Sequence, residues 1–226
     1  MGAAGMPGRV IAAQDVWKSY DGREEVLRGV DLDVDPGESA LVWGENGSGK
    51  TTLLSILGGL EPPSRGFVEV GGREITSLRE KHLARVRLLE IGFVFQTHRL
   101  LEDLTLEENV ALPLRLAKRP AEARVVELLE VFGLTKLASR RPGEVSVGES
   151  QRAAVARALA NGPRVLLADE PTASLDPKGT AAVLDALRIA RENFGAAEVV
   201  AAHDSGVRTL EATEYVLEDG RLRKRA

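Results

Sequence analysis

The sequence predicts an α/β fold with a mainly parallel sheet, an antiparallel β element near the N-terminus and a helical insertion. Short apolar runs alternate with segments of helical periodicity, the usual pattern of strands joined by helices. Several runs are unbroken, as expected for strands buried on both faces of a sheet. The long stretch 97–160 has helical periodicity without a strong strand signal and predicts the insertion.

Strands and helices are expected in alternation along most of the chain. Strands are expected at 10–13, 39–43, 66–70, 91–95, 165–168 and 198–202. Helices are expected at 51–58, 78–89, 106–116, 121–132, 148–160 and 177–193. Residues 30–34 alternate strictly between apolar and acidic side chains, which predicts an additional, half-exposed antiparallel strand.

The composition is that of an ordinary globular protein. The chain has 226 residues, of which 43% are hydrophobic and 28% are charged. A net charge of −4 argues against nucleic acid as a partner. Cysteine is absent, which excludes disulfides and cysteine-based metal sites. No apolar run approaches the roughly 20 residues that cross a bilayer, so work at a membrane would require another chain to hold this one there.

The chain is expected to form one domain behind a short leader. Residues 1–8 are small and lack the apolar core of a secretion signal, so we expect a flexible leader. Residues 9–226 are expected to form a single domain. Its core would comprise 9–96 and 161–226, and a helical subdomain would cover about 97–160.

A phosphate-binding loop is predicted by the pattern G-x-x-x-x-G-K-[ST], which occurs in Gly44-Glu45-Asn46-Gly47-Ser48-Gly49-Lys50-Thr51-Thr52. The glycines let the backbone curl until successive N–H groups point at phosphate oxygens. Lys50 offers a compact charge to the β- and γ-phosphates, and the Thr51 hydroxyl can ligate Mg²⁺. The alternative is an ordinary glycine-rich turn. A buried strand before the loop and a helix after it favour a nucleotide phosphate site.

Two carboxylates end the apolar strand expected at 165–168. Asp169 would lie beside the phosphate loop and hold Mg²⁺, directly or through water. Glu170 would be the general base that activates or orients the attacking water. Strands often end in carboxylates without any function, so this interpretation depends on the nearby phosphate loop.

A capped helix is predicted to start within Val145-Ser146-Val147-Gly148-Glu149-Ser150-Gln151-Arg152. Ser146 would cap the helix and Glu149 would complete a capping box. A capped helix start with Ser and Gly is also an anion site, and the two interpretations do not exclude each other. This segment resembles the signature of ABC-type ATPases, usually written L-S-G-G-Q or L-S-G-G-E.

Other motifs of that family occur at matching places, so the resemblance covers nearly the whole chain and implies the P-loop NTPase fold of an ABC ATPase. Tyr20 matches the aromatic residue that stacks on adenine; the alternative is an ordinary core or surface tyrosine. Gln96 resembles the glutamine that touches Mg²⁺ or the attacking water. His203 resembles the switch histidine that contacts the γ-phosphate, although a histidine at a strand end is more often structural.

The resemblance implies ATP and Mg²⁺ as ligands and ATP hydrolysis as the activity. The chain has no N-K-x-D motif, so ATP is expected rather than GTP. Two such domains would face head to tail, and each site would combine the phosphate loop of one with the signature of the other. Ser146, Gly148 and Glu149 would then face the partner's nucleotide, and Asp176, in a Ser-Leu-Asp sequence, would cross to the partner.

The signature departs from the family pattern at Val147, which stands where the first glycine is usual. Its isopropyl group would hinder close approach or restrict the backbone. We therefore expect ATP binding to persist, with weakened hydrolysis or weakened dimer closure.

The sequence after Gln96 is similar to bacterial ABC ATPases of lipoprotein release, macrolide export and cell division. This branch implies integral membrane permease subunits as partners and a peripheral place on the cytoplasmic side of the membrane. The cell-division members leave an alternative open, a regulatory ATPase that gates an extracytoplasmic enzyme. An ABC ATPase acting on DNA or ribosomes is disfavoured, because the chain has no coiled-coil insertion, no second cassette and no basic excess. A homodimer with ATP is expected, although pairing with a different chain stays open.

Three leucines after Gln96, namely Leu100, Leu101 and Leu104, are candidates for a groove that receives the permease. The alternative is core packing of the helical insertion. The two histidines outside the motifs, His82 and His98, are expected at the surface.

Overall fold

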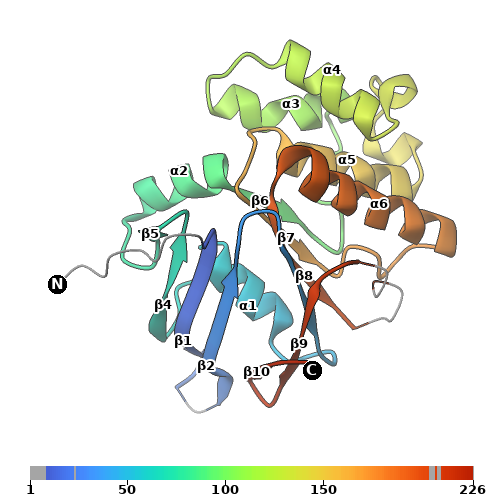
Figure 1. Ribbon diagram of the computed structural model, residues 1–226. Coiled ribbons are helices and arrows are strands. Elements are labelled where there is room, and N and C mark those ends of the chain that lie inside the picture. Colours follow the sequence, from blue (N-terminus) through green and yellow to red (C-terminus); the bar gives the residue numbers. More distant parts are fainter. Residues whose placement is uncertain (1–8, 23, 204–206, 208–209, 226) are drawn as a thin grey trace.

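The computed structural model describes residues 9–22, 24–203, 207 and 210–225, and the expected leader 1–8 lies outside them. The strands, labelled in Figure 1, are β1 (Ile11–Ser19), β2 (Glu25–Val34), β3 (Ser39–Trp43), β4 (Arg65–Val70), β5 (Arg73–Glu74), β6 (Ile91–Val94), β7 (Val165–Asp169), β8 (Ala197–Ala202), β9 (Thr213–Glu218) and β10 (Arg221–Lys224). The helices are α1 (Lys50–Leu57), α2 (Glu80–Glu90), α3 (Leu106–Leu116), α4 (Glu122–Val131), α5 (Val147–Leu159) and α6 (Pro177–Phe194), with short 3₁₀ turns at Thr135–Leu137 and Pro142–Glu144.

The larger sheet has six strands in the order β10-β9-β3-β8-β7-β6. Strands β9, β3, β8, β7 and β6 are parallel, whereas β10 is antiparallel to β9, so the predicted mainly parallel α/β fold is confirmed. In a parallel sheet the carboxyl ends of the strands meet at one edge, where α/β proteins bind ligands. The loops at this edge follow β3, β6, β7 and β8 and carry Gly44, Gln96, Glu170 and His203.

The central strands β3, β7 and β8 of the larger sheet are buried on both faces, and the alternation of side chains along each strand divides the core in two. Ala40 and Val42 of β3 belong to the cluster shared with α1 and the smaller sheet. Leu41 and Trp43 belong to the cluster shared with α3, α5 and α6. Figure 1 shows α1 near the smaller sheet and α5 and α6 across the larger one. Burial on both faces explains the unbroken apolar runs.

The smaller sheet is antiparallel, with four strands in the order β2-β1-β4-β5. It contains the predicted antiparallel segment 30–34, which is the end of a longer β2. The strands expected at 10–13 and 66–70 also lie here, as β1 and β4, and not in the parallel sheet. An apolar run indicates burial but not the pairing partner. The pairing of Ile11 with both Val34 and Val70 places β1 between two antiparallel neighbours.

Strands β5, β9 and β10 are additional to the predicted elements. Strand β9 reads Thr-Glu-Tyr-Val-Leu-Glu and β10 reads Arg-Leu-Arg-Lys, so charged side chains hide the apolar pattern. Charged strands are typical of sheet edges, and β10 is an edge of the larger sheet.

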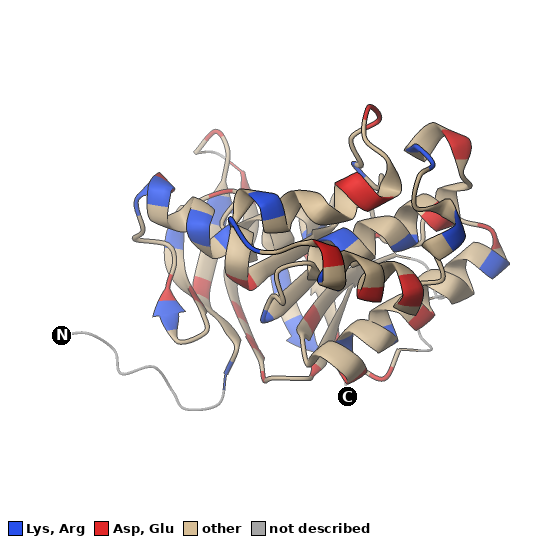
Figure 2. Ribbon diagram, turned by 90° about the horizontal axis from the view of Figure 1, so that it is seen from above, with Lys and Arg blue, Asp and Glu red and all other residues tan. Residues whose placement is uncertain are grey.

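Helices α3, α4 and α5 occupy most of the stretch 97–160, and their apolar side chains join those of α6 in one core. Figure 2, a view from above Figure 1, shows lysines and arginines interspersed with acidic residues on the helices that face the viewer. In the part of the chain that the structure describes, no helix is both long and apolar enough to span a membrane.

Candidate nucleotide site

The loops at the carboxyl edge of the larger sheet enclose a cleft of about 550 Å³ around the predicted phosphate loop. The cleft combines that loop with residues that follow β6, β7 and β8. Its lining residues are Val26, Asn46, Gly47, Gly49, Lys50, Thr51, Thr52, Gln96, Glu170, Ala173 and His203. The fold therefore brings together four predicted segments that are far apart in the chain.

The phosphate loop has a backbone that requires glycine. Gly47 and Gly49 have φ angles of 82° and 101°, in the left-handed region, and Gly49 precedes the first residue of α1. Position 44 has no room for a side chain, because a Cβ there would lie 2.4 Å from Ser48 Oγ and 2.7 Å from Leu217 O, so Gly44 is required. This geometry places the amino end of α1 at the cleft, where its dipole favours an anion.

Lys50 is buried and its side chain is directed into the loop. Its ammonium donates to the backbone oxygens of Gly44 at 2.8 Å and Glu45 at 3.0 Å, and lies 3.2 Å from Glu170 Oε1. A buried ammonium requires such partners. Phosphate oxygens can replace them, because they carry at least as much negative charge, so the geometry fits the predicted contact with phosphates.

Thr51 and Asp169 meet at the position predicted for the metal. Thr51 Oγ1 donates to Asp169 Oδ2 at 2.8 Å. Burial raises the pKa of the Asp169 carboxyl, although the Thr51 hydrogen bond lowers it. Asp169 Oδ1 is buried and has no hydrogen-bond partner among the described residues. A cation would supply that partner, so these side chains fit Mg²⁺.

Protein ligands alone would not complete the coordination shell of Mg²⁺. Across the described residues, no three His, Cys, Asp or Glu side chains gather in a way that could hold a metal. Thr51 and Asp169 would therefore share the ion with phosphate oxygens and water, as is usual for Mg²⁺ in nucleotide sites.

Glu170 is held from two sides. Its Oε1 faces Lys50, and its Oε2 lies 2.8 Å from His203 Nδ1. Its backbone has a φ of 45°, which is rare outside glycine, and its N–H donates to Ala201 O of β8 at 2.9 Å. This fixed backbone presents the carboxylate to the cleft, where it can accept a proton from water.

Gln96 lines the cleft two residues after the end of β6, and a residue not singled out from the sequence holds the backbone before it. Gln151 of α5 is buried, and its Nε2 donates to Phe95 O at 2.8 Å. The helix that carries the signature is thus tied to the strand end that presents Gln96. The signal in the sequence that could have identified Gln151 is its polar side chain within the signature segment.

Tyr20 follows β1 directly and is 61% exposed. Its hydroxyl donates to Glu61 Oε2 at 2.9 Å and lies 3.1 Å from Thr52 Oγ1. An exposed aromatic ring beside Thr52 is within reach of a base whose phosphates lie on the loop.

The signature segment is not part of this cleft. Ser146, Gly148 and Glu149 do not line it, and Val147 is 53% exposed. The predicted capping box is confirmed, because Ser146 Oγ accepts from the Glu149 N–H and the Glu149 side chain accepts from the Ser146 N–H. The Ser146 N–H, and then the Ser146 hydroxyl, donate to the Glu149 carboxylate and lower its pKa. Asp176 also lies outside the cleft and caps the amino end of α6.

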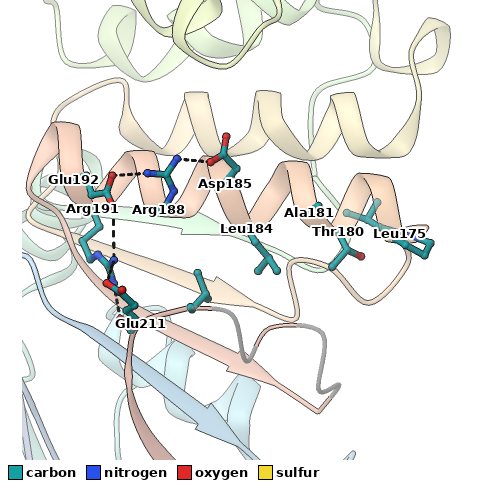
Figure 3. A pocket seen from close by; sticks show the side chains of 11 residues that line it. Leu175, Thr180, Ala181, Leu184, Asp185, Arg188, Arg191, Glu192 and Glu211 are labelled. Atoms are coloured by element: carbon teal, nitrogen blue, oxygen red, sulfur yellow. Dashed lines mark hydrogen bonds and ion pairs between the residues drawn. The ribbon is translucent and has the colours of Figure 1, made fainter.

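A separate pocket of about 660 Å³ lies along α6 (Figure 3). Arg188 forms ion pairs with Asp185 and Glu192 along the helix. Arg191 Nη1 donates to Glu211 O at 2.5 Å, which ties the helix to the segment before β9. Because acidic side chains engage both guanidinium groups, this pocket suits a phosphate less well than the cleft at Lys50.

The residues after Gln96 need two corrections. Leu100 is buried in the core, as the alternative of core packing implied, and Leu104 is half-buried, whereas Leu101 is 49% exposed. His98 is half-buried and its Nδ1 accepts from the Leu100 N–H, so it is not a plain surface residue. His82 is exposed, as predicted.

The fold and the cleft define a P-loop nucleotide-binding protein. The ABC transporter family matches residues 27–173, which is more than half of the chain. The chain belongs to this family and is an ATP-binding, ATP-hydrolysing subunit of a transporter.

Relatives and solved structures agree with this family. The chain is 47% identical over 211 residues to the lipoprotein-releasing system ATP-binding protein LolD 2 of Caulobacter vibrioides, with 92% of each chain covered. It is 40% identical over 218 residues to LolD of Bacteroides thetaiotaomicron, with 95% of this chain and 100% of the relative covered. The dimeric post-hydrolysis structure of the ATP-binding cassette MJ0796 bound to ADP and Pi has a TM-score of 0.85 and 36% identity, covering 95% and 97% of the two chains.

Proposed function

We propose that this chain powers a bacterial membrane complex of the lipoprotein-releasing type through ATP-driven closure of a head-to-tail dimer. One observation carries this proposal: the phosphate loop and the capped signature segment, which would be the two halves of one nucleotide site, lie apart in one chain. The cleft at Lys50 lacks the signature, and the capped signature segment is exposed elsewhere. A two-fold axis would bring the signature of a second copy onto the first cleft. The dimeric cassette bound to ADP and Pi supports this arrangement.

Each part of the closed site then has one task. Lys50 and the amino end of α1 bind the β- and γ-phosphates. Thr51, Asp169 and Gln96 hold Mg²⁺, which offsets phosphate charge when bound. Tyr20 stacks on the adenine. The remaining contacts come from Gly44, Glu45, Asn46, Gly47, Ser48, Gly49 and Thr52 of the loop, and from Ser146, Gly148, Glu149 and Asp176 across the dimer.

Glu170 and His203 carry the chemical step. The water oxygen forms a bond to the γ-phosphorus while the bond to the β–γ bridging oxygen breaks, and Glu170 accepts the water proton. His203 orients the Glu170 carboxylate through the 2.8 Å contact and faces the γ-phosphate. Lys50 must leave Glu170 in order to reach the phosphates, so binding of ATP frees the carboxylate for water.

The partner in this proposal is an integral membrane permease, which holds the chain on the cytoplasmic side of the membrane. Identities of 47% and 40% to lipoprotein-releasing ATPases support this. We place the contact with the permease at a groove of about 230 Å³ whose lining includes Phe93, Phe95 and Arg157. The rings of the two phenylalanines are nearly parallel, with centroids 5.5 Å apart, and contribute apolar surface to this groove.

We further propose that 9–226 act as one domain with a core at 9–96 and 161–226 and a helical subdomain at 97–160. The hydrogen bond from Gln151 to Phe95 O joins these two parts directly before Gln96. A nucleotide that displaces Gln96 would therefore also displace the signature helix.

The substitution Glu170→Gln tests the proposal. It keeps the size of the side chain but removes the proton acceptor, so ATP turnover should fall by about 10²-fold or more while ATP binding persists. With ATP and Mg²⁺ the variant should form a stable dimer in size-exclusion chromatography with light scattering, because hydrolysis no longer opens the closed state.

The matched control is Glu122→Gln, at the exposed start of α4, which should hydrolyse ATP like the wild type. A Glu170→Gln variant that stays monomeric with ATP and hydrolyses it at the normal rate would overturn the proposed role.

A further inference from the structure

Four side chains, Lys18, Tyr20, Thr52 and Glu61, form one connected cluster between the end of β1 and α1. The Tyr20 hydroxyl donates to Glu61 Oε2 at 2.9 Å and lies 3.1 Å from Thr52 Oγ1. A phenol has a single hydrogen, so with that hydrogen on Glu61 the Thr52 hydroxyl is the donor to Tyr20. The phenol oxygen is therefore held by two partners at once.

Lys18 approaches the same ring from one face. Its Nζ lies 5.0 Å from the centroid of the Tyr20 ring and 3.4 Å from Glu61 Oε2, and it donates to Pro62 O at 2.8 Å. A cation over a tyrosine face is attracted by the π electrons. Lys18 is buried whereas Tyr20 is largely exposed, so the lysine covers one face and the opposite face remains accessible.

The backbone on both sides of the cluster is fixed. Lys18 lies in β1 and pairs with Leu27 of β2. The Glu61 N–H donates to the Ser55 carbonyl of α1 at 3.2 Å. The ring is therefore held relative to α1 before a nucleotide arrives, and less side-chain freedom is lost when a base stacks on it.

We infer that Lys18 and Glu61 are positioning residues that fix the Tyr20 ring as a base-stacking platform in register with the phosphate loop. This inference rests on the proposed nucleotide site and adds to it two residues that act through Tyr20. Because the Lys18 ammonium covers one face, the free face takes a flat, electron-rich base such as adenine. Thr52 belongs to the phosphate loop. The side chain that contacts the Tyr20 hydroxyl therefore also lies next to the place where the phosphates would bind.

The test compares a ligand that uses the platform with one that does not. ADP and inorganic pyrophosphate, each with Mg²⁺, are titrated into the full chain by isothermal titration calorimetry. Tyr20→Phe keeps the stacking face but loses both hydrogen bonds of the hydroxyl. It should weaken ADP binding by about 3- to 10-fold and change pyrophosphate binding by less than about 2-fold.

Lys18→Met and Glu61→Ala, which removes the acceptor of the Tyr20 hydroxyl, should show the same selective loss, by about 3-fold each, and should raise KM for ATP with little change in kcat. Glu74→Gln on β5 and Lys81→Met on α2 remove exposed charges elsewhere and should bind both ligands like the wild type. Circular dichroism melting checks that each variant is folded. Tyr20→Phe changes an exposed side chain, so the test remains available even if Lys18→Met does not fold.

Unchanged ADP affinity in both Tyr20→Phe and Glu61→Ala would overturn the positioning role. Tighter ADP binding in these variants would also overturn it, because the cluster would then obstruct the base. A wild-type chain that binds neither ADP nor pyrophosphate would overturn the proposed nucleotide site itself. That result is distinct from a loss of the preference for ADP over pyrophosphate.

Discussion

In the cleft, the charges of single side chains compensate one another. Lys50 lies between the loop carbonyls and Glu170, and His203 contacts the other oxygen of Glu170. A triphosphate carries more negative charge than one carboxylate and should displace Glu170 from Lys50. In the proposed mechanism, the ion pair between Lys50 and Glu170 thus links nucleotide binding to the release of Glu170, the proposed general base.

Glu198 is a buried acid with no part in the proposed chemistry. It lies in β8 with a fully buried side chain, opposite the buried Ser39 of β3, whose hydroxyl lowers the pKa of the carboxyl. Burial raises the pKa of Glu198 to about 8, although the charge of Arg191 opposes the shift. The folded state then binds this proton more tightly than the unfolded state. The free energy of unfolding should therefore fall as pH rises from about 4.5 to about 8.

The substitution Glu198→Gln should raise the free energy of unfolding at pH 8 by on the order of 3 kcal/mol, since an amide has no charge to desolvate. At pH 5 most of this gain should disappear, because the folded wild type is then protonated at Glu198. Urea denaturation at both pH values measures the difference, with the exposed Glu74→Gln as control. Equal gains at pH 5 and pH 8 would show that the pKa of Glu198 is not raised.

Among the elements, the signature helix α5 and strand β6 form a coupled pair. Gly92 of β6 lets them approach closely, since a Cβ there would lie 2.7 Å from Ala158 O of α5 and 3.0 Å from Leu166 Cδ1. Gln151 of α5 holds the carbonyl of Phe95, the residue before Gln96. The position of α5 therefore determines where Gln96 enters the cleft.

The substitution Gly92→Ala should lower the free energy of unfolding by about 1–3 kcal/mol, because the new methyl group meets backbone atoms that cannot turn away. It should also slow ATP turnover at temperatures where the variant stays folded, through displacement of α5 and Gln96. Urea denaturation and a phosphate-release assay measure the two effects. Gly143→Ala is the control, since the nearest atom to its Cβ would be 4.0 Å away. If the two variants are equally stable and active, the close approach is unimportant.

At the scale of the whole molecule, the cleft at Lys50 and the exposed signature segment lie apart, and Val147 belongs to the signature segment. Val147 is the first residue of α5, and its φ is not in the left-handed region, so valine does not strain the helix. Of the two effects expected from the sequence, restriction of the backbone is therefore the weaker one. The exposed isopropyl group remains as an obstacle to a partner's nucleotide.

The substitution Val147→Gly should raise ATP turnover by about 3- to 10-fold in the complex purified from membranes with its integral partner. The reason is closer approach of the signature to the γ-phosphate of the opposite site. Val126→Ala, which trims an exposed valine on α4, should leave turnover unchanged. If turnover does not increase, Val147 is not the residue that limits ATP hydrolysis. Purified complexes that contain no integral membrane protein would contradict the proposed membrane assembly.

The sequence alone was sufficient for the α/β class and the phosphate loop, because both are local. The loop from Gly44 to Thr52 depends on glycines at fixed spacing, and its conformation is set by neighbours in the chain. The capping box of Ser146 and Glu149 is local in the same sense. Apolar runs likewise report burial on both faces of a sheet without any knowledge of its other strands.

Tertiary structure alone decided which distant segments pair and which side chains meet. It placed β1 and β4 in the antiparallel sheet, since strand pairing depends on hydrogen-bond partners that no single run encodes. It brought Lys18 and Glu61 to Tyr20, and Glu170 to Lys50 and His203. It also kept the signature segment away from its own phosphate loop. These are contacts between residues far apart in the chain, and only packing of the whole molecule determines them.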